Sequence, residues 1–171
     1  SDDLGGAVVG TPALGKDGTV YVGNFANQMV AIDGQSGKVK HSYTTNGWVW
    51  AGPILANDKL YFGDLTGNFY ALNASDLSQV WKVQPDVADA RKIADKPLVT
   101  QDTIYFSSES GNLFALSLAD GSTRWSKPAG GKLNSGPVSA GNLVLVAPDS
   151  GPLLVAFETN GNQKWAFTPA K

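Results

Sequence analysis

Several residue types that carry chemistry or cross-links are missing or scarce in this chain of 171 residues. There is no cysteine, which excludes disulfide bonds, thiolate metal ligands and cysteine nucleophiles. The only histidine, His41, has no nucleophile–carboxylate arrangement beside it in the sequence. Phosphate-binding glycine loops, zinc signatures, calcium-binding loop spacings and nucleophile elbows are also absent. We therefore expect neither a metal site nor catalytic residues.

Charge and long apolar runs are scarce as well. Charged residues make up 16% of the chain, below the roughly 25% of ordinary soluble domains. With 13 basic and 15 acidic residues, the chain lacks the basic surface that nucleic-acid binding needs. No apolar run approaches the roughly 20 residues of a membrane-spanning helix, so no direct membrane span is expected. Because it begins with Ser and carries no signal peptide, we expect a processed or truncated product.

The main feature that is present is a phrase of about eleven residues that occurs four times. It leads from a small residue through a turn to an aromatic ring, and the fourth copy is one residue shorter: Ala31 to His41, Ala71 to Trp81, Ala115 to Trp125 and Ala156 to Trp165. The alanines are 40, 44 and 41 residues apart. A period near 40 is typical of repeat architectures.

Each repeat divides into four short segments of β-branched, aromatic and leucine residues, which are typical of strands. No sustained helical period occurs, and 20 glycines and nine prolines favour a turn-rich β protein. Between the second and third segments, Asn27, Gly67 and Gly111 are predicted to take left-handed turn positions. The fourth repeat has Pro152 there, so Gly151 is predicted to supply the left-handed residue.

The third segment of every repeat is apolar on both faces, which favours small sheets stacked face to face around an axis. A proline in each first segment fits an edge strand, which in such a stack is the innermost strand. We therefore predict an all-β chain, a single β-propeller unit over residues 1–171 with four four-stranded antiparallel blades. The predicted blades cover about residues 7–43, 48–83, 92–127 and 132–167.

These phrases resemble the pyrroloquinoline-quinone-like (PQQ-like) β-propeller repeat of the quinoprotein alcohol dehydrogenase-like superfamily. Its signature is Ala-x-Asp-x-x-Thr-Gly-x-x-x-Trp, and the matching residues are Ala31, Asp33 and Gly37; Ala71 and Trp81; Ala115, Gly121 and Trp125; Ala156, Gly161 and Trp165. Ser36 replaces Thr in the first repeat, and Leu77 replaces Gly in the second. The resemblance implies that the closing tryptophans dock between neighbouring blades, with His41 as a weaker version of the same dock.

Members of this family usually close with seven or eight blades, so four blades would form about half of an eight-bladed ring. Three arrangements are compatible with four blades: the chain pairs with a copy of itself, it belongs to a longer propeller, or the four blades close alone by adjusting their angles. Unclosed blade faces would be large apolar patches, which soluble monomers rarely expose. We favour a fragment of a longer protein, with a protein partner or self-association through the open blade faces.

The segments that lead into the innermost strands differ most between repeats and are predicted to line one mouth of the propeller. Counting back from each proline aligns Ala7, Trp48, Lys92 and Lys132, and then Val9, Trp50, Ala94 and Asn134. Trp48 and Trp50 should point the same way, beside Arg91, Lys92 and Lys132, with Asn134 on the same arc. These residues form the candidate ligand-binding site. The alternative is that the tryptophans plug a narrow channel and the basic residues are merely solvated.

Two classes of function remain from the resemblance. The favoured one is a non-catalytic extracytoplasmic scaffold for protein or ligand binding, periplasmic or extracellular and anchored, if at all, through a part outside this chain. The alternative is a fragment of a PQQ-dependent quinoprotein dehydrogenase acting on alcohols or sugars. That activity would need the quinone, a calcium ion held by Glu, Asn and Asp, a catalytic Asp and, in many relatives, a vicinal cysteine pair. The cysteine pair is absent, and no motif supplies the calcium ligands, so we expect no cofactor.

Overall fold

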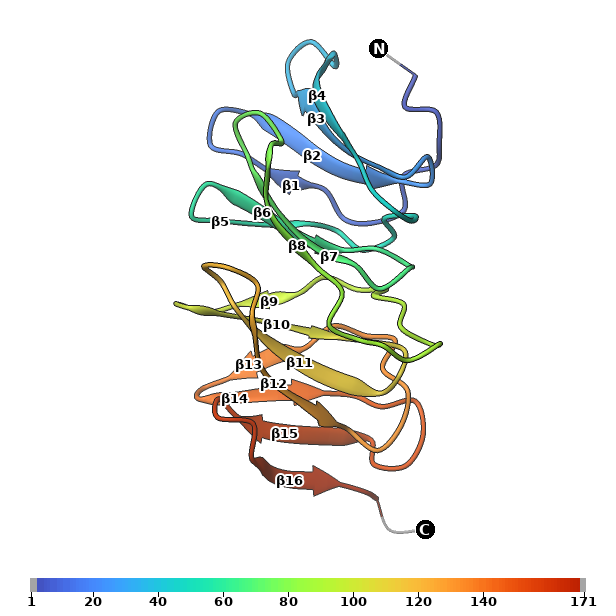
Figure 1. Ribbon diagram of the computed structural model, residues 1–171, viewed down its shortest axis with the longest axis vertical. Helices are drawn as coiled ribbons and strands as arrows, with labels where there is room; N and C mark the ends of the chain where they lie inside the picture. Colours follow the sequence, from blue (N-terminus) through green and yellow to red (C-terminus); the bar gives the residue numbers. More distant parts are fainter. Residues whose placement is uncertain (1–2, 170–171) are drawn as a thin grey trace.

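The computed structural model describes residues 3–169, which form strands and turns (Figure 1). Four four-stranded antiparallel sheets follow one another along the chain, each with its strands in sequence order, as predicted. The strands are β1 Ala13–Leu14, β2 Thr19–Asn24, β3 Gln28–Asp33, β4 Val39–Thr44, β5 Ile54–Ala56, β6 Lys59–Gly63, β7 Phe69–Asn73, β8 Gln79–Val83, β9 Leu98–Val99, β10 Thr103–Ser107, β11 Asn112–Ser117, β12 Thr123–Pro128, β13 Val138–Ala140, β14 Leu143–Val146, β15 Leu154–Glu158 and β16 Gln163–Phe167. Within this part of the chain, no helix is long and apolar enough to cross a membrane.

The turns between the second and third strands of the blades adopt the backbone conformations that the sequence predicts. Asn27, Gly67 and Gly111 have φ values of 59°, 84° and 88°. In the fourth blade Gly151 has a φ of 79°, so it supplies the left-handed residue beside Pro152. Glycine and asparagine are the residues that reach this region at least cost, which explains their positions in the repeat.

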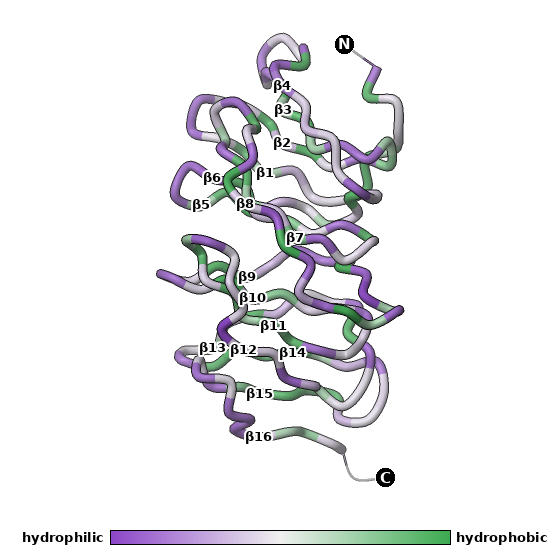
Figure 2. The backbone as a smooth tube through the Cα atoms, viewed as in Figure 1, coloured by the Kyte–Doolittle hydropathy of each residue, from purple (hydrophilic) through white to green (hydrophobic). Residues whose placement is uncertain are grey.

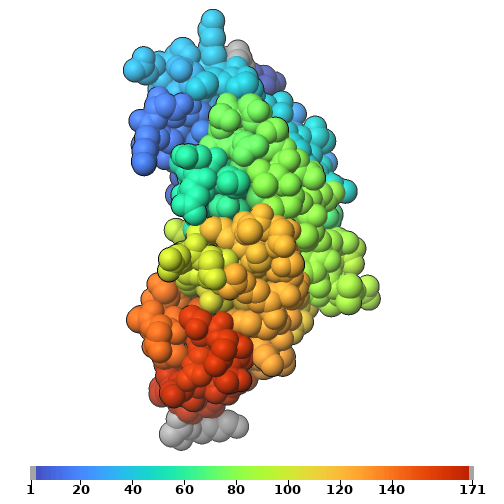
Figure 3. Space-filling view, turned by 60° about the vertical axis from the view of Figure 1, so that its left-hand side comes forward, coloured from blue at the N-terminus to red at the C-terminus, as the bar shows by residue number. Residues whose placement is uncertain are grey.

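The blades stack in chain order, and the two ends of the chain lie at opposite ends of the stack (Figure 1). Innermost strands approach each other, β1 beside β5 and β5 beside β9, whereas no such approach joins the outer strands β4, β8, β12 and β16 of neighbouring blades. The first three blades therefore come closest to one another at their innermost strands, as wedge-shaped blades do. The hydropathy colouring shows apolar strands at the centre of the stack and polar turns at its margins (Figure 2), and the space-filling view shows the blades in close contact from blue to red (Figure 3).

Three apolar cores lie between successive blades and hold the stack together. The core between the second and third blades is built on aromatic rings: Phe69 stacks on Phe106 with centroids 4.6 Å apart, and Phe106 stacks on Phe114 at 5.1 Å. Because each central blade contributes one apolar face to each of two cores, its middle strands are apolar on both sides. This is the physical reason for the two-sided apolar pattern in the sequence.

Each anchor alanine lies directly across the strand pair from the aromatic residue that closes its blade, and a β-bulge follows it. The pairs are Ala31 with His41, Ala71 with Trp81, Ala115 with Trp125 and Ala156 with Trp165. The small side chain therefore leaves room for the ring on the same face of the sheet. The repeated bulge re-aims the last strand at the same point in every blade.

Two of the tryptophans dock on the following blade, as the family resemblance implies. The indole N–H of Trp81 donates to the Leu118 carbonyl at 3.3 Å, and that of Trp125 donates to the Thr159 carbonyl at 2.9 Å. The rings lie against glycines in the same turns. A Cβ on Gly121 would fall 2.8 Å from the Trp81 ring, and a Cβ on Gly161 would fall 2.9 Å from the Trp125 ring. The glycine of the repeat is therefore the seat of the preceding blade's tryptophan.

The first and second blades use a different version of this dock. Leu77 occupies the glycine position with a φ of 59° and is 2% exposed, so it fills the space that a tryptophan fills elsewhere. His41, the smaller ring, is only half-buried. The hydrogen bond is supplied by Tyr21, whose hydroxyl donates to the Ala74 carbonyl at 2.9 Å. His41 was expected to be a weaker version of the tryptophan dock. In the structure the contact between these two blades depends on Leu77 and Tyr21 instead.

Candidate functional site

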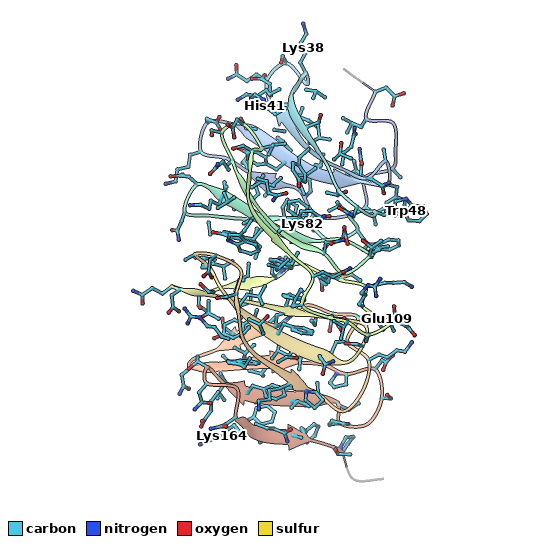
Figure 4. All side chains as sticks on the ribbon, in the orientation of Figure 1. Lys38, His41, Trp48, Lys82, Glu109 and Lys164 are labelled. Carbon is cyan, nitrogen blue, oxygen red and sulfur yellow. The ribbon has the colours of Figure 1, made fainter. Side chains whose placement is uncertain are left out.

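One side of the stack carries the connections between blades together with the turns between second and third strands. Four residues that the sequence aligned, Ala7, Trp48, Lys92 and Lys132, accept the same backbone hydrogen bond through their carbonyls. The donors are the amides of Phe25, Leu65, Glu109 and Asp149, at 2.9–3.0 Å. The four connections therefore superpose as repeats, and we call this side the loop face. Trp48 and Glu109 mark it in Figure 4.

The connections alternate between buried and exposed residues. Val49, Ile93 and Leu133, each 0–2% exposed, insert between blades. Gly23 and Gly63 make room for two of them, since a Cβ there would fall 2.2 Å from Val49 and 2.3 Å from Ile93. The residues on either side of the inserted one point outward. This alternation is why the two tryptophans of the second connection share one direction.

Trp48 and Trp50 form an aromatic cluster with Phe25, a residue that the sequence analysis did not single out. The Trp48 ring stacks on Phe25 with centroids 4.9 Å apart and planes 12° apart, and Trp50 stacks on it at 5.4 Å and 27°. Trp48 remains 50% exposed and Trp50 43% exposed. The residue of this connection that inserts between the blades is Val49, which is fully buried. Phe25 occupies the same turn position in the first blade that Glu109 occupies in the third. Aligning these turns between repeats would have identified it.

The basic residues gather farther along the loop face, around one carboxylate. Lys132 lies 3.3 Å and Lys92 3.4 Å from the Glu109 carboxylate oxygens. The hydrogen bond from Lys132, followed by that from Lys92, holds the pKa of Glu109 below its ordinary value. Both lysine side chains remain more than half exposed. Two cations around one anion leave this ion cluster with a net charge of about +1.

The other two predicted site residues have local partners. Arg91 donates from Nε to the Thr66 carbonyl at 2.9 Å and from Nη1 to the Ala88 carbonyl at 3.3 Å, which ties its connection to the neighbouring turn. Asn134 approaches Asp149 at 3.5 Å. The predicted arc is therefore divided into an aromatic cluster over the first two blades and an ion cluster over the last two.

Two buried carboxylates beneath the loop face also escaped sequence analysis. Asp64 is fully buried and accepts hydrogen bonds from the Thr66 and Asn68 amides and, at 2.7 Å, from the Tyr70 hydroxyl. Burial, and then the contact with Asp64, raises the pKa of Tyr70. Asp86 is 4% exposed and accepts from the Ser108 and Ser110 hydroxyls. These groups are satisfied by turn hydrogen bonds, so they position the connections.

The family resemblance implies, for its quinone-dependent members, a calcium ion held by Glu, Asn and Asp side chains. Among residues 3–169, no three His, Asp or Glu side chains come together as a possible metal site. The buried carboxylates Asp64 and Asp86 each accept hydrogen bonds from neighbouring turn residues instead.

Comparison with known proteins agrees with this architecture. A search of curated protein sequences finds no match. Among solved structures, BamB from Moraxella catarrhalis superposes with a TM-score of 0.82 at 17% identity, covering 96% of this chain and 54% of that one. The quinohemoprotein alcohol dehydrogenase from Comamonas testosteroni superposes with a TM-score of 0.79 at 19% identity, covering 94% of this chain and 35% of that one. A europium-containing methanol dehydrogenase superposes with a TM-score of 0.78 at 18% identity, covering 95% of this chain and 42% of that one.

These likenesses show the fold, and the chain spans about half the length of BamB and less of the dehydrogenases. The family assignment comes from the sequence. The model of the family described as outer membrane protein assembly factor BamB matches residues 1–167. Its repeat is the one that the alanine–tryptophan phrases and the four blades display. The chain therefore belongs to the BamB family of PQQ-like β-propellers.

Proposed function

We propose that this chain is part of a non-catalytic extracytoplasmic scaffold that binds a protein partner through its loop face. The observation that carries the proposal is the cluster of Phe25, Trp48 and Trp50. Aromatic side chains half-exposed in a rigid, stacked arrangement are typical of binding hot spots, because their burial by a partner costs little side-chain entropy. Loops on a rigid propeller are also where binding residues of such folds are found.

The family supports a protein as the ligand. Its description names outer membrane protein assembly, which implies a periplasmic setting and polypeptide partners. The ion cluster adds a preference: with about one unmatched positive charge around Glu109, the loop face favours acidic groups in the partner. A segment that presents an aromatic or aliphatic side chain to Trp48 and a carboxylate to Lys92 or Lys132 fits both clusters.

The test uses a fluorescein-labelled ten-residue peptide that alternates aromatic and acidic residues, with fluorescence anisotropy as the readout. Replacing Trp48 by alanine is expected to weaken binding about tenfold or more, the usual loss at a hot spot. Trp165→Ala is the matched control, because Trp165 is also half-exposed at 40% but lies on the last blade's outer strand. Undiminished binding by Trp48→Ala would remove the aromatic cluster from the site. A peptide with lysines in the acidic positions is expected to bind more weakly.

The dehydrogenase alternative has its own test. The chain is incubated with pyrroloquinoline quinone and Ca²⁺ and then passed through a gel-filtration column. We expect no quinone absorbance to elute with the protein, because no three His, Asp or Glu side chains come together among residues 3–169. A chromophore retained at one equivalent would contradict the non-catalytic assignment.

A further inference from the structure

A cavity of about 310 Å³ lies between the second and third blades. The turns that join β5 to β6 and β9 to β10 border it, and both turns lie on the side of the stack opposite the loop face (Figures 1 and 4). Both blades belong to the described part of the chain, so the walls of the cavity do not depend on the ends of the stack. These walls include Lys59 and Tyr61 of β6, Asp102 and Arg124 of the third blade, and the apolar side chains of Leu118 and Ala119.

The hydroxyl of Tyr61 is a polar group of this cavity that has no hydrogen-bond partner among residues 3–169, although the residue is only 1% exposed. Comparison with the preceding interface explains why. There, the equivalent Tyr21 donates to the Ala74 carbonyl at 2.9 Å. The carbonyl equivalent to that of Ala74 belongs to Leu118, and it accepts the indole N–H of Trp81 instead, at 3.3 Å. Burial raises the pKa of Tyr61, so its hydroxyl keeps its proton and can donate to a ligand.

Lys59 is the second group of the cavity without a partner. It precedes Tyr61 by two residues on β6, so the two side chains project from the same side of the strand. Lys59 is half-buried, yet within residues 3–169 it has neither an ion pair nor a hydrogen bond. In the first and third blades a threonine at this position, Thr19 or Thr103, accepts a hydrogen bond from a basic residue of the outer strand. The second blade has Val80 on its outer strand and carries its positive charge on Lys59 instead.

The remaining walls give the cavity a charge and an apolar side. Arg124 forms an ion pair with Asp102 at 2.9 Å, so these two charges balance. The charge of Lys59 is left over, and the cavity has a net charge of about +1. Because water screens a half-buried cation less than a fully solvated one, this charge attracts an anion more strongly than that of a surface lysine. Leu118 and Ala119 provide a wall for an apolar group beside it.

We infer that this cavity binds a small molecule that carries a single carboxylate next to an apolar body. One carboxylate oxygen accepts from the Lys59 ammonium, the other accepts from the Tyr61 hydroxyl, and the body of the molecule lies against Leu118 and Ala119. One carboxylate matches the single unbalanced positive charge, whereas a phosphate group carries nearly two negative charges. The volume is at the lower end of the range of ligand pockets, which fits a small molecule. Such a site lies apart from the loop face and goes beyond the scaffold role.

A titration of the full ¹⁵N-labelled chain with benzoate, followed through amide chemical shifts, tests this inference. Saturable shifts are expected in the turn between β5 and β6 and at Leu118 and Ala119. Benzamide has nearly the same shape without the charge and should bind about tenfold more weakly or not at all. Inorganic phosphate, which lacks the apolar body, should also bind more weakly than benzoate. Equal binding of benzoate and benzamide, or shifts without saturation, would overturn the inference.

Two variants and two matched controls identify the site. Lys59→Met should weaken benzoate binding about tenfold or more, and Tyr61→Phe about threefold or more. Because the Tyr61 hydroxyl has no partner in the chain, Tyr61→Phe should leave Tm unchanged, so it remains decisive if Lys59→Met does not fold. Lys38→Met removes the same charge from an exposed position, and Tyr21→Phe removes a hydroxyl that Ala74 already engages. Both controls should bind benzoate as wild type does. An equal loss in Lys38→Met and Lys59→Met would show unspecific attraction and refute the site, as would undiminished binding by Tyr61→Phe.

Discussion

Truncating the closing tryptophan of each blade is expected to destabilise the fold in a graded order. Trp81 is 7% exposed, contacts Tyr61 and Phe69, and hydrogen-bonds the next blade. A buried tryptophan covers about 150–250 Å², and at roughly 25 cal/mol per Å² this corresponds to about 4–6 kcal/mol. Alanine keeps part of this burial, so Trp81→Ala should cost about 4 kcal/mol, within the usual range for a buried tryptophan.

The same substitution at Trp125 and Trp165 provides a comparison for the cost of Trp81→Ala. Trp125 is more exposed than Trp81 but keeps its hydrogen bond, so Trp125→Ala should cost roughly 3 kcal/mol. Within residues 3–169, Trp165 has neither a following blade nor that hydrogen bond, and water can enter the space that truncation leaves. We expect Trp165→Ala to cost roughly 1–2 kcal/mol. For a chain of this size about 4 kcal/mol lowers Tm by roughly 8–16 °C.

Urea and thermal unfolding, followed by circular dichroism at a concentration where the chain is monomeric, measure the series. The variants share one substitution at equivalent positions, so differences in propensity cancel and the context of each ring decides the order. Equal losses for Trp81→Ala and Trp165→Ala would refute the docking argument, because Trp165 has no blade to dock on within the monomer.

Two further predictions concern the first interface and the alkaline limit of stability. Leu77→Gly alone should lower the free energy of unfolding by roughly 2 kcal/mol, because a buried leucine is lost while left-handed backbone strain is relieved. Adding His41→Trp should rebuild the tryptophan dock and recover that loss. A double-mutant cycle measured by urea unfolding that shows no coupling between the two sites would contradict this. All five tyrosines have pKa values raised above 10, mainly by burial, so their neutral forms stabilise the fold below about pH 10 and this stability is lost as the pH rises through the raised values. Tyrosinate absorbance should therefore appear together with unfolding, and ionisation of all five phenols near pH 10 in the folded chain would show the reasoning to be wrong.

The fold was predictable because each of its determinants is local and repeated. The turn residues Asn27, Gly67 and Gly111 mark hairpins through their left-handed conformation, and the alanine–tryptophan spacing fixes a strand pair. The equivalence of Ala7, Trp48, Lys92 and Lys132 followed from counting and is matched by one shared hydrogen bond. Because the repeat occurs four times in one sequence, comparing the repeats with one another identifies equivalent positions without any other sequence.

The site was only partly predictable because its contacts join different repeats. Phe25 lies 23 residues before Trp48 and meets it through a turn whose neighbour in space the sequence does not name. Glu109 likewise holds Lys92 and Lys132 from a turn between the two connections. Leu77 was noted as a departure from the signature, but its compensation for His41 depends on packing across two blades. Counting within one repeat cannot reveal such pairs.

Repeat equivalence also separates the two kinds of exposed apolar residue in this molecule. Val8 is exposed at a position that is buried in every other repeat, so its exposure reports the open end of the stack. Trp48 stands at a position where Lys92 and Lys132 are also exposed, and blades pack on both sides of its connection. Closing the ring would therefore bury Val8 and leave Trp48 facing outward. Packing accounts for apolar residues at the ends, whereas the tryptophans on the loop face have no packing role that demands them, which is why they are the residues to test for a partner.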